Sequence, residues 1–392
     1  MNTFDPLSPE FARAPFEHLA AMRGIGKPYV HTNTLKRLVS IFSYADCDAV
    51  LQDHENWSSD RGESVRKAGL GDAMILLFDD PPDHTRRRNA VKRQFMPTAL
   101  AGMKTAIESR VGQLLADANG KAIDFVTAIA APLTISTIGL MLSIEDDDIE
   151  RVRGWTEKLA RIDGLANFLH QPDDWMEQAA SSTLNEMADF FSAKIRSHDG
   201  QRNDLLSVLL ASELSRDEAV SMAKFMLHAG NETTTNLLSQ LVLLLIEHQD
   251  QYARLKAGPE LISGAIDEAL RLRGSFRETE RVSKLDCEFS GVKILKGDTV
   301  VTWLASGNRD PSVFVEPDRF DIARQPNRHL SFARGIHTCL GNMLAKSEAA
   351  AFLGALIQHD ATLELVGDNA VTWSDNPLMN GLTKLVVRIT QK

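Results

Sequence analysis

The stretch that decides the fold runs from Leu330 to Gly341, with the sequence LSFARGIHTCLG. Glycines stand on both sides of its cysteine, Cys339, and a helical pattern of apolar residues begins directly after it. The sulfur is therefore expected at the N-terminus of a helix, where backbone N–H groups and the positive end of the helix dipole stabilise a thiolate. Because the thiolate is the form of cysteine that binds metal, we expect Cys339 to be a metal ligand.

The residues around Cys339 suit a large, flat ligand. Gly335 and Gly341 carry no Cβ and let the backbone come close to such a group, and Phe332 can shield the sulfur from water. The pattern Phe-x-x-Gly-x-His-x-Cys-x-Gly resembles the haem-binding loop of the cytochrome P450 family, in which the cysteine thiolate is the axial ligand of the haem iron. One position departs from the family, because Ala333 stands where glycine is usual.

Composition limits the class of protein. The 392 residues are 43% hydrophobic and 24% charged, which excludes a disordered or collagen-like chain. The net charge of −10 argues against a nucleic-acid-binding surface as the main feature of the chain. Cys47 and Cys287 lie far from Cys339 and no Cys-x-x-Cys pair occurs, so neither a disulfide framework nor a zinc site is expected, and a reducing compartment is indicated.

Neither a targeting segment nor a membrane span is expected. The N-terminus lacks a basic segment followed by an apolar one. The strongest apolar run, residues 241–246, is far shorter than the ~20 residues that cross a bilayer. We therefore expect a soluble, cytoplasmic monomer that binds neither nucleic acid nor membrane.

The chain is expected to form one domain over residues 1–392, because no flexible linker or repeat divides it. Its fold class is mainly α with a small β region, and the resemblance implies the P450 fold, a triangular helix-rich unit around a buried haem. The longest helix begins with the capping box Ser215-Arg216-Asp217-Glu218. Apolar spacing predicts helices over 98–118, 147–169, 175–197 and 215–248, and β-branched residues between turns predict strands near 29–43, 281–305 and 362–390.

A second motif lies on a helix before the stretch Leu330 to Gly341, which we call the cysteine loop. Glu268 and Arg271 stand three residues apart, so they can pair on one helix face. Many solvated helices carry such pairs, so the pair alone is weak evidence. Followed by Asn308-Arg309-Asp310-Pro311 and Pro317-Asp318-Arg319-Phe320, it resembles the Glu-x-x-Arg helix and meander of the family, and this implies that Arg319 completes a buried ionic triad with a structural role.

The resemblance also implies partners for the two propionates of a haem. The segment Asp80 to Arg88 resembles the start of the third helix of the family, where a histidine and an arginine four residues apart point toward the propionates. These are His84 and Arg88 here, while Arg281 and His337 match two further propionate partners. Ala229 and Phe332 complete the expected haem contacts. Taken singly, each charged residue is more simply a solvated surface charge.

The middle of the longest helix contains Ala229-Gly230-Asn231-Glu232-Thr233, a poor helix sequence because of its glycine and threonines. A simple kink is the structural alternative. The segment resembles the acid-alcohol motif of the family, which implies that Gly230 leaves room for dioxygen, that the Thr233 hydroxyl hydrogen-bonds to it, and that Glu232 relays protons. Glu232 and Thr233 are the expected catalytic residues.

The resemblance implies a haem b monooxygenase that hydroxylates or O/N-dealkylates an apolar small molecule with O2. Electrons are expected from a separate ferredoxin, its ferredoxin reductase and NAD(P)H. A haem sensor without turnover and a peroxide-driven oxidase are the alternatives. The expected pocket includes Phe225, Ala229, Phe276, Leu378, Met379 and parts of 61–78 and 160–180, where Arg61, Arg66 or Lys67 can anchor a carboxylate; the expected ferredoxin-docking residues are Arg86, Arg87, Lys92, Arg93, Arg334 and Lys346.

Overall fold

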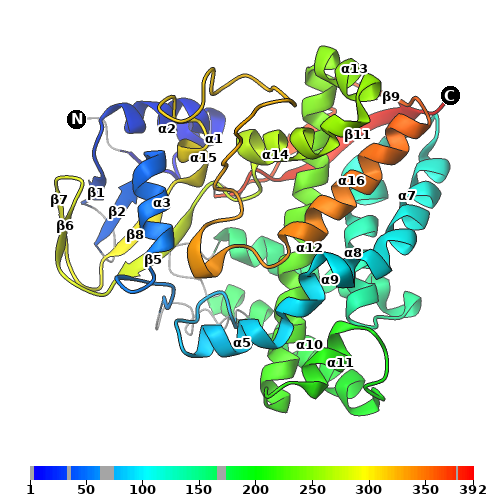
Figure 1. Ribbon diagram of the computed structural model, residues 1–392, viewed down its shortest axis with the longest axis horizontal. Helices are drawn as coiled ribbons and strands as arrows, with labels where there is room; N and C mark the ends of the chain where they lie inside the picture. Colours follow the sequence, from blue (N-terminus) through cyan, green and yellow to red (C-terminus); the bar gives the residue numbers. More distant parts are fainter. Residues whose placement is uncertain (1–3, 33–36, 62–74, 166–173, 377) are drawn as a thin grey trace.

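Helices dominate the chain in this computed structural model, which describes residues 4–32, 37–61, 75–165, 174–376 and 378–392. The long helix α12 (Arg216–Glu247) crosses the molecule from end to end (Figure 1). Its predicted capping box is confirmed: the Glu218 N–H donates to Ser215 Oγ at 3.2 Å, and the Ser215 N–H donates to Glu218 Oε2 at 3.0 Å. Most apolar residues of α12 are buried, so this helix forms the centre of the core.

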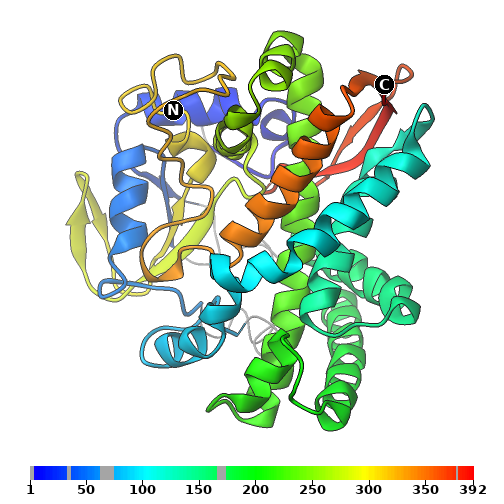
Figure 2. The same ribbon diagram turned by 45° about the vertical axis from the view of Figure 1, so that its right-hand side comes forward.

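Helices surround α12 on several sides. In both ribbon views α7 (Lys104–Ala118) and α16 (Asn342–Gln358) lie side by side across it (Figures 1 and 2). The other large helices packed on α12 are α8 (Ala131–Met141), α9 (Ile149–Leu165), α10 (Asp174–Ser197) and α14 (Ile262–Arg273). Shorter helices are α1 (Pro9–Arg13), α2 (Pro15–Gly24), α3 (Tyr44–Gln52), α5 (Asp83–Val91), α6 (Pro97–Leu100), α11 (Leu205–Ala211), α13 (Gln249–Ala257) and α15 (Leu304–Gly307).

A five-stranded sheet has the strand order β1-β2-β8-β5-β3. Its strands β2 and β8 are parallel, with Leu38 opposite Thr299, and the other neighbours are antiparallel. This sheet and the β6–β7 hairpin lie on the side of the molecule that holds the N-terminus (Figure 1). The strands are β1 (Tyr29–His31), β2 (Leu38–Ile41), β3 (Trp57–Ser58), β5 (Thr279–Ser283), β6 (Cys287–Phe289), β7 (Val292–Ile294) and β8 (Thr299–Thr302).

The C-terminal strands form a second sheet beside α7 and α16. Strand β11 (Leu382–Thr390) is its centre and pairs with three others, all antiparallel. One partner comes from the first third of the chain, so the C-terminal strands are joined to the segment after α7. The three partners are β4 (Ala122–Asp124), β9 (Thr362–Leu365) and β10 (Val371–Trp373).

The fold class and the main elements agree with the expectation from the sequence. The helix expected over 98–118 is interrupted, because α6 is followed by a 3-10 turn before α7 begins. Helix α8 was not predicted, since its sequence APLTISTIGLM is rich in β-branched residues. Most of its side chains are buried, and packing against α12 overrides this weak local preference.

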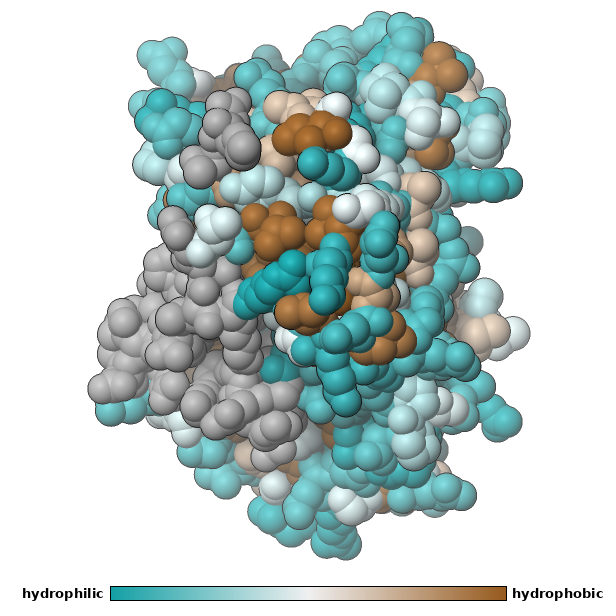
Figure 3. Space-filling view, turned by 90° about the vertical axis from the view of Figure 1, so that its left-hand side faces the viewer, coloured by the Kyte–Doolittle hydropathy of each residue, from teal (hydrophilic) through white to brown (hydrophobic). Residues whose placement is uncertain are grey.

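The surface is largely hydrophilic on the side of the strands. Figure 3 shows this face, with a small group of hydrophobic residues near its centre. Among the described residues, no helix is both long and apolar enough to cross a membrane.

Candidate active site

Cys339 lies three residues before α16, at the helix start that the sequence predicts. Its side chain is half-buried, and its backbone N–H donates to the carbonyl oxygen of Phe332 at 2.9 Å. Burial raises the pKa of the Cys339 thiol, while backbone N–H groups of Gly341 and Asn342 and the charge of Arg88 act in the opposite direction. The sulfur therefore has amide donors directed at it, as a thiolate ligand needs.

Two residues of this loop have backbone conformations that the sequence alone did not reveal. Gly335 has φ +68°, and a Cβ there would lie 2.6 Å from the carbonyl oxygen of Leu51 in α3. Its lack of a side chain permits this contact with α3, and the expectation that it also makes room for a ligand stays a prediction. Ala333 has φ +52°, a left-handed conformation that favours glycine by roughly 1–2 kcal/mol. This explains why glycine suits the position better than alanine.

Four basic residues from three separate segments meet near the cysteine loop. His84 and Arg88 lie on α5, Arg281 lies on β5, and His337 precedes Cys339. The rings of His84 and His337 have centroids 4.1 Å apart, and Arg88 Nη2 donates to the carbonyl of Thr338 at 2.6 Å. The positions that the resemblance assigns to the propionate partners are thus brought together.

The charges of Arg88 and Arg281, together with the neutral rings of His84 and His337 as hydrogen-bond donors, make this cluster suited to an anionic ligand. Burial, and then the charges of Arg281 and His84, lower the pKa of His337 to about 3. Burial and the charge of Arg88 likewise lower the pKa of His84. Both ring nitrogens of His84 and Nε2 of His337 are buried without a hydrogen-bond partner among the described residues. Such atoms cost about 1–3 kcal/mol each unless a ligand bonds to them, and the carboxylates of a haem fit that need.

The predicted oxygen-activating segment remains helical through residues 229–235. The Thr233 hydroxyl donates to the Ala229 carbonyl one turn earlier at 2.8 Å, and Ser275 Oγ donates to the Thr233 carbonyl at 2.7 Å. A Cβ on Gly230 would lie 3.3 Å from Ile138 Cδ1 of α8. The missing side chain of Gly230 therefore makes room for α8, and its expected role beside dioxygen stays a prediction.

A buried polar network next to Glu232 was missed by the sequence analysis. Asn231 accepts a hydrogen bond from Thr134 Oγ1 of α8 at 2.7 Å and donates one to Thr156 Oγ1 of α9 at 2.9 Å. Thr134 also bonds Thr235 at 2.9 Å. Asn231 thus joins three helices at the centre of the molecule. The only signal in the sequence was an amide inside a helix predicted to be buried.

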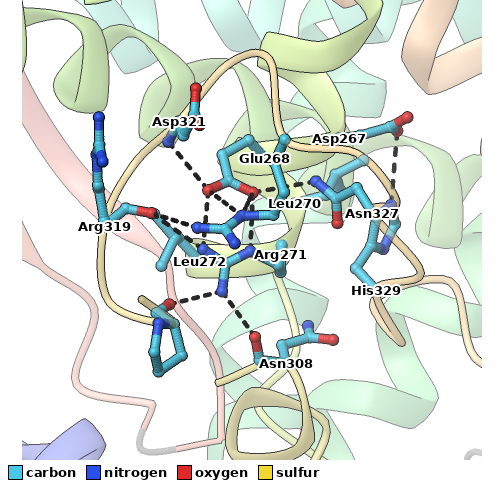
Figure 4. Close-up of polar contacts among 12 residues, drawn as sticks. Asp267, Glu268, Leu270, Arg271, Leu272, Asn308, Arg319, Asp321, Asn327 and His329 are labelled. Carbon is cyan, nitrogen blue, oxygen red and sulfur yellow. Dashed lines mark hydrogen bonds and ion pairs between the residues drawn. The ribbon is translucent and has the colours of Figure 1, made fainter. Parts of the chain in front are cut away.

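The expected ionic network forms, but Arg324 takes the place of Arg319. Figure 4 shows the side chain of Arg319 directed away from Glu268. Glu268 and Arg271 are fully buried and share two hydrogen bonds of 2.8 Å. Arg324 Nε donates to both carboxylate oxygens of Glu268, at 3.0 and 3.1 Å. The side chain of Arg319 instead pairs with Glu316 in an exposed position at 3.0 Å, and only its carbonyl accepts from Arg271. The assignment of Arg319 to the triad is therefore wrong.

The expected pocket residues are placed only in part. Phe276 is 46% exposed and is bridged by backbone pairing to Met379, which is buried beside Leu378. Arg61 lies 3.4 Å from Glu280 and 4.6 Å from the centre of the Phe78 ring. Phe225 of α12 is partly buried and packs against the large hydrophobic cluster formed by buried side chains of α12 and the helices around it. Arg66, Lys67 and residues 166–173 lie outside the described residues.

Comparison with known proteins identifies the family. The cytochrome P450 family model matches residues 260–367, which hold Glu268, Arg271 and Cys339. The chain is 33% identical over 399 residues to the cytochrome P450 monooxygenase PikC of Streptomyces venezuelae, covering 97% of this chain and 92% of PikC.

Two solved structures share the fold over nearly their whole length. P450BioI, in complex with an acyl carrier protein ligated to hexadec-9Z-enoic acid, matches with a TM-score of 0.89 and 28% identity, covering 98% of this chain and 100% of that one. CYP109E1 of Bacillus megaterium, in complex with testosterone, matches with a TM-score of 0.84 and 28% identity, covering 95% and 99%. The chain therefore belongs to the cytochrome P450 family and is a bacterial-type P450 monooxygenase, an oxidoreductase that incorporates molecular oxygen.

Proposed function

We propose that this chain holds haem b through Cys339 and uses O2 to hydroxylate or dealkylate an apolar small molecule. The observation that carries the proposal is the meeting of His84, Arg88, Arg281 and His337 beside the Cys339 loop, with buried ring nitrogens that have no hydrogen-bond partner within the described part of the chain. When bound, haem supplies the iron chemistry that splits dioxygen, and a thiolate ligand favours that cleavage.

Glu232 and Thr233 are the proposed catalytic residues of α12. The Thr233 hydroxyl donates to Ala229 at 2.8 Å, so its proton has a resting partner inside the helix and its oxygen can accept a second hydrogen bond. Glu232 is the adjacent carboxyl group, and we infer that a proton passes from it to Thr233 Oγ1 and then to the oxygen that leaves as water. Asn231 holds this segment in place through its bonds to α8 and α9.

An apolar substrate is supported by the side chains expected around it. Phe225, Phe276, Leu378 and Met379 offer hydrocarbon surface. The related structures of P450BioI and CYP109E1 hold an acyl chain and testosterone, which are both largely apolar. Alkyl or ring carbon in such a molecule is the proposed site of oxygen insertion.

A ferredoxin, reduced by NAD(P)H through a ferredoxin reductase, is the proposed electron donor. The proposed docking face is the one where α5 borders the cysteine loop. A hollow of ≈ 270 Å³ lies between them, lined by His84, Thr85, Arg88, Asn89, Gly335 and Ile336. Lys92 and Arg93 are exposed at the end of α5. We therefore propose that they attract an acidic ferredoxin to this face.

The other basic residues expected at the docking face have acidic partners within the chain. Such partners neutralise part of the charge that these residues would offer to a ferredoxin, so Lys92 and Arg93 carry most of the proposed attraction. Arg86 and Arg87 pair with Glu218, Arg334 pairs with Asp48, and Lys346 pairs with Asp267.

The test is turnover with isotopically labelled oxygen. The haem-loaded protein is first screened for compounds that convert its absorbance from low spin to high spin, and a hit is then incubated with ¹⁸O2, NAD(P)H, a ferredoxin and its reductase. One ¹⁸O atom in a hydroxylated product, or in the aldehyde released by dealkylation, supports the proposal. Binding without any product favours a sensor, and product only with added peroxide favours a peroxide-driven oxidase; either result refutes the proposal.

A further inference from the structure

A charged cluster lies on the side of the cysteine loop that faces α14. Asp267 of α14 lies 2.6 Å from Lys346 Nζ of α16 and 3.5 Å from Nε2 of His329, which begins the segment leading to the cysteine loop. Figure 4 shows Asp267 and His329 pointing toward each other beside the Glu268 network. His329 is buried, whereas Asp267 and Lys346 are partly exposed. One carboxylate therefore joins α14, α16 and the cysteine loop.

Both groups bound by Asp267 also contact Phe332. The ring centroids of His329 and Phe332 are 5.6 Å apart at an angle of 57°, and Lys346 Nζ lies 5.7 Å from the centre of the Phe332 ring. The carbonyl of Phe332 accepts the Cys339 N–H at 2.9 Å. Contacts thus run without a break from Asp267 through Phe332 to Cys339.

The backbone of the loop has a separate anchor. Ser331 Oγ donates to the carbonyl of Leu270 at 2.5 Å and accepts from Asn308 Nδ2 at 2.9 Å, and the Leu330 N–H donates to Asn308 Oδ1 at 2.6 Å. This anchor fixes the main chain, so it leaves the orientation of the Phe332 ring to the Asp267 cluster. The two sets of contacts can therefore be separated by mutation.

Charge balance within the cluster is set by Asp267 and Lys346. Burial alone would raise the pKa of Asp267, but the bonds from His329 and Lys346 lower it overall, so the carboxylate is ionised at neutral pH. Burial lowers the pKa of His329, although Asp267 opposes this. The facing charges of Lys346 and Arg334 lower it further. Asp267 and Lys346 are thus the charged pair, with His329 between the carboxylate and the ring.

We propose that Asp267, His329 and Lys346 are positioning residues, which hold the ring of Phe332, the residue whose carbonyl bonds to the Cys339 N–H, and balance the charge on that side of the haem ligand. The proposal deepens the proposed function and rests on Cys339 being the ligand. A carboxylate near the haem favours its oxidised form and an ammonium favours its reduced form, because reduction adds a negative charge. Removing each partner must therefore move the reduction potential in opposite directions.

The test is the reduction potential of the holoenzyme in three variants. Asp267→Asn should make the potential more positive, Lys346→Met should make it more negative, and the double variant should return toward the wild-type value. Glu316→Gln, which removes a carboxylate from an exposed pair, is the matched control and should leave it unchanged. Shifts of one sign in both single variants, or no shift, would overturn the electrostatic role, since a purely structural disturbance has no reason to change sign.

Hydrogen exchange measured on the same holoenzymes tests the positioning role. His329→Leu should speed exchange of the Cys339 amide about tenfold, the change given by a loss of about 1.4 kcal/mol. Ser331→Ala should instead act first on the amides of 330–333, where the backbone anchor lies. Unchanged Cys339 exchange in His329→Leu would overturn the positioning role. The carbonyl complex of the wild type keeps the two proposals apart: if it lacks the thiolate band, the proposed function fails, and if it has the band while the variants behave as wild type, only this inference fails.

Discussion

Replacing Arg324 with methionine should destabilise the protein far more than replacing Arg319. Arg324 is 10% exposed and donates two hydrogen bonds to Glu268, which is fully buried. Loss of one partner from a buried ion pair costs about 3–5 kcal/mol. Glu268 would keep Arg271, the Asp321 N–H at 3.1 Å and Asn327 Nδ2 at 3.0 Å, so we expect the lower end, about 3 kcal/mol.

The matched change Arg319→Met should leave the free energy of unfolding nearly unchanged. The pair of Arg319 with Glu316 is exposed at both ends, and exposed pairs contribute about 0–1 kcal/mol. Its backbone carbonyl, which accepts from Arg271, is unaffected by the substitution. The two variants therefore separate the arginine that the sequence order suggests from the one that reaches the carboxylate.

Urea denaturation of both holoproteins, followed by far-UV circular dichroism and by the haem absorbance band, measures the difference. Arg324→Met should move the midpoint of unfolding to a much lower urea concentration, with a similar dependence of the unfolding free energy on urea. Arg319→Met should leave the midpoint close to that of the wild type. Equal midpoints for the two variants, or a larger loss in Arg319→Met, would refute the assignment of Arg324 to the ionic network.

Three further predictions concern catalysis, pH and electron transfer. Thr233→Ala should keep substrate binding and NAD(P)H consumption but release the electrons as hydrogen peroxide; full coupling would remove Thr233 from proton delivery. Burial and the charge of Glu280 raise the pKa of Glu278 from 4.5 to about 8, so the unfolded chain loses its proton first and stability falls as pH rises between these values. Glu278→Gln should abolish that fall in the melting temperature, and parallel pH curves would contradict it. Glutamate at both Lys92 and Arg93 should slow reduction by ferredoxin at low salt without changing substrate affinity, and an unchanged rate would place docking elsewhere.

The long helices and the three strand regions could be predicted from the sequence because their signals are local. Capping at Ser215 and the helix start after Cys339 depend on residues within one turn. Helix α8 was not predicted because its residues have a weak helix preference, and burial against α12 stabilises the helix instead. Strand β4 was not predicted because it depends on pairing with β11, which lies more than 250 residues away in the sequence.

The residues of the site could be predicted only at positions that match the motifs of the family. His84 and His337 come into ring contact from 253 positions apart, which no local pattern encodes. The meander offers several arginines, and the path of the loop decides that Arg324, rather than Arg319, reaches Glu268. Gly230 and Gly335 were expected to leave room for ligands, and their contacts with α8 and α3 could not be predicted because tertiary packing sets them.

The most direct test of the central claim is the absorbance of the ferrous carbonyl complex in Cys339→Ser. We expect the wild type to show the red-shifted band of thiolate ligation and Cys339→Ser to lose it. Cys287→Ser and Cys47→Ser should keep the band, since neither residue lies in the cysteine loop. A Cys339→Ser protein that retains the red-shifted band, or a Cys287→Ser protein that loses it, would contradict the assignment of Cys339 as the haem ligand.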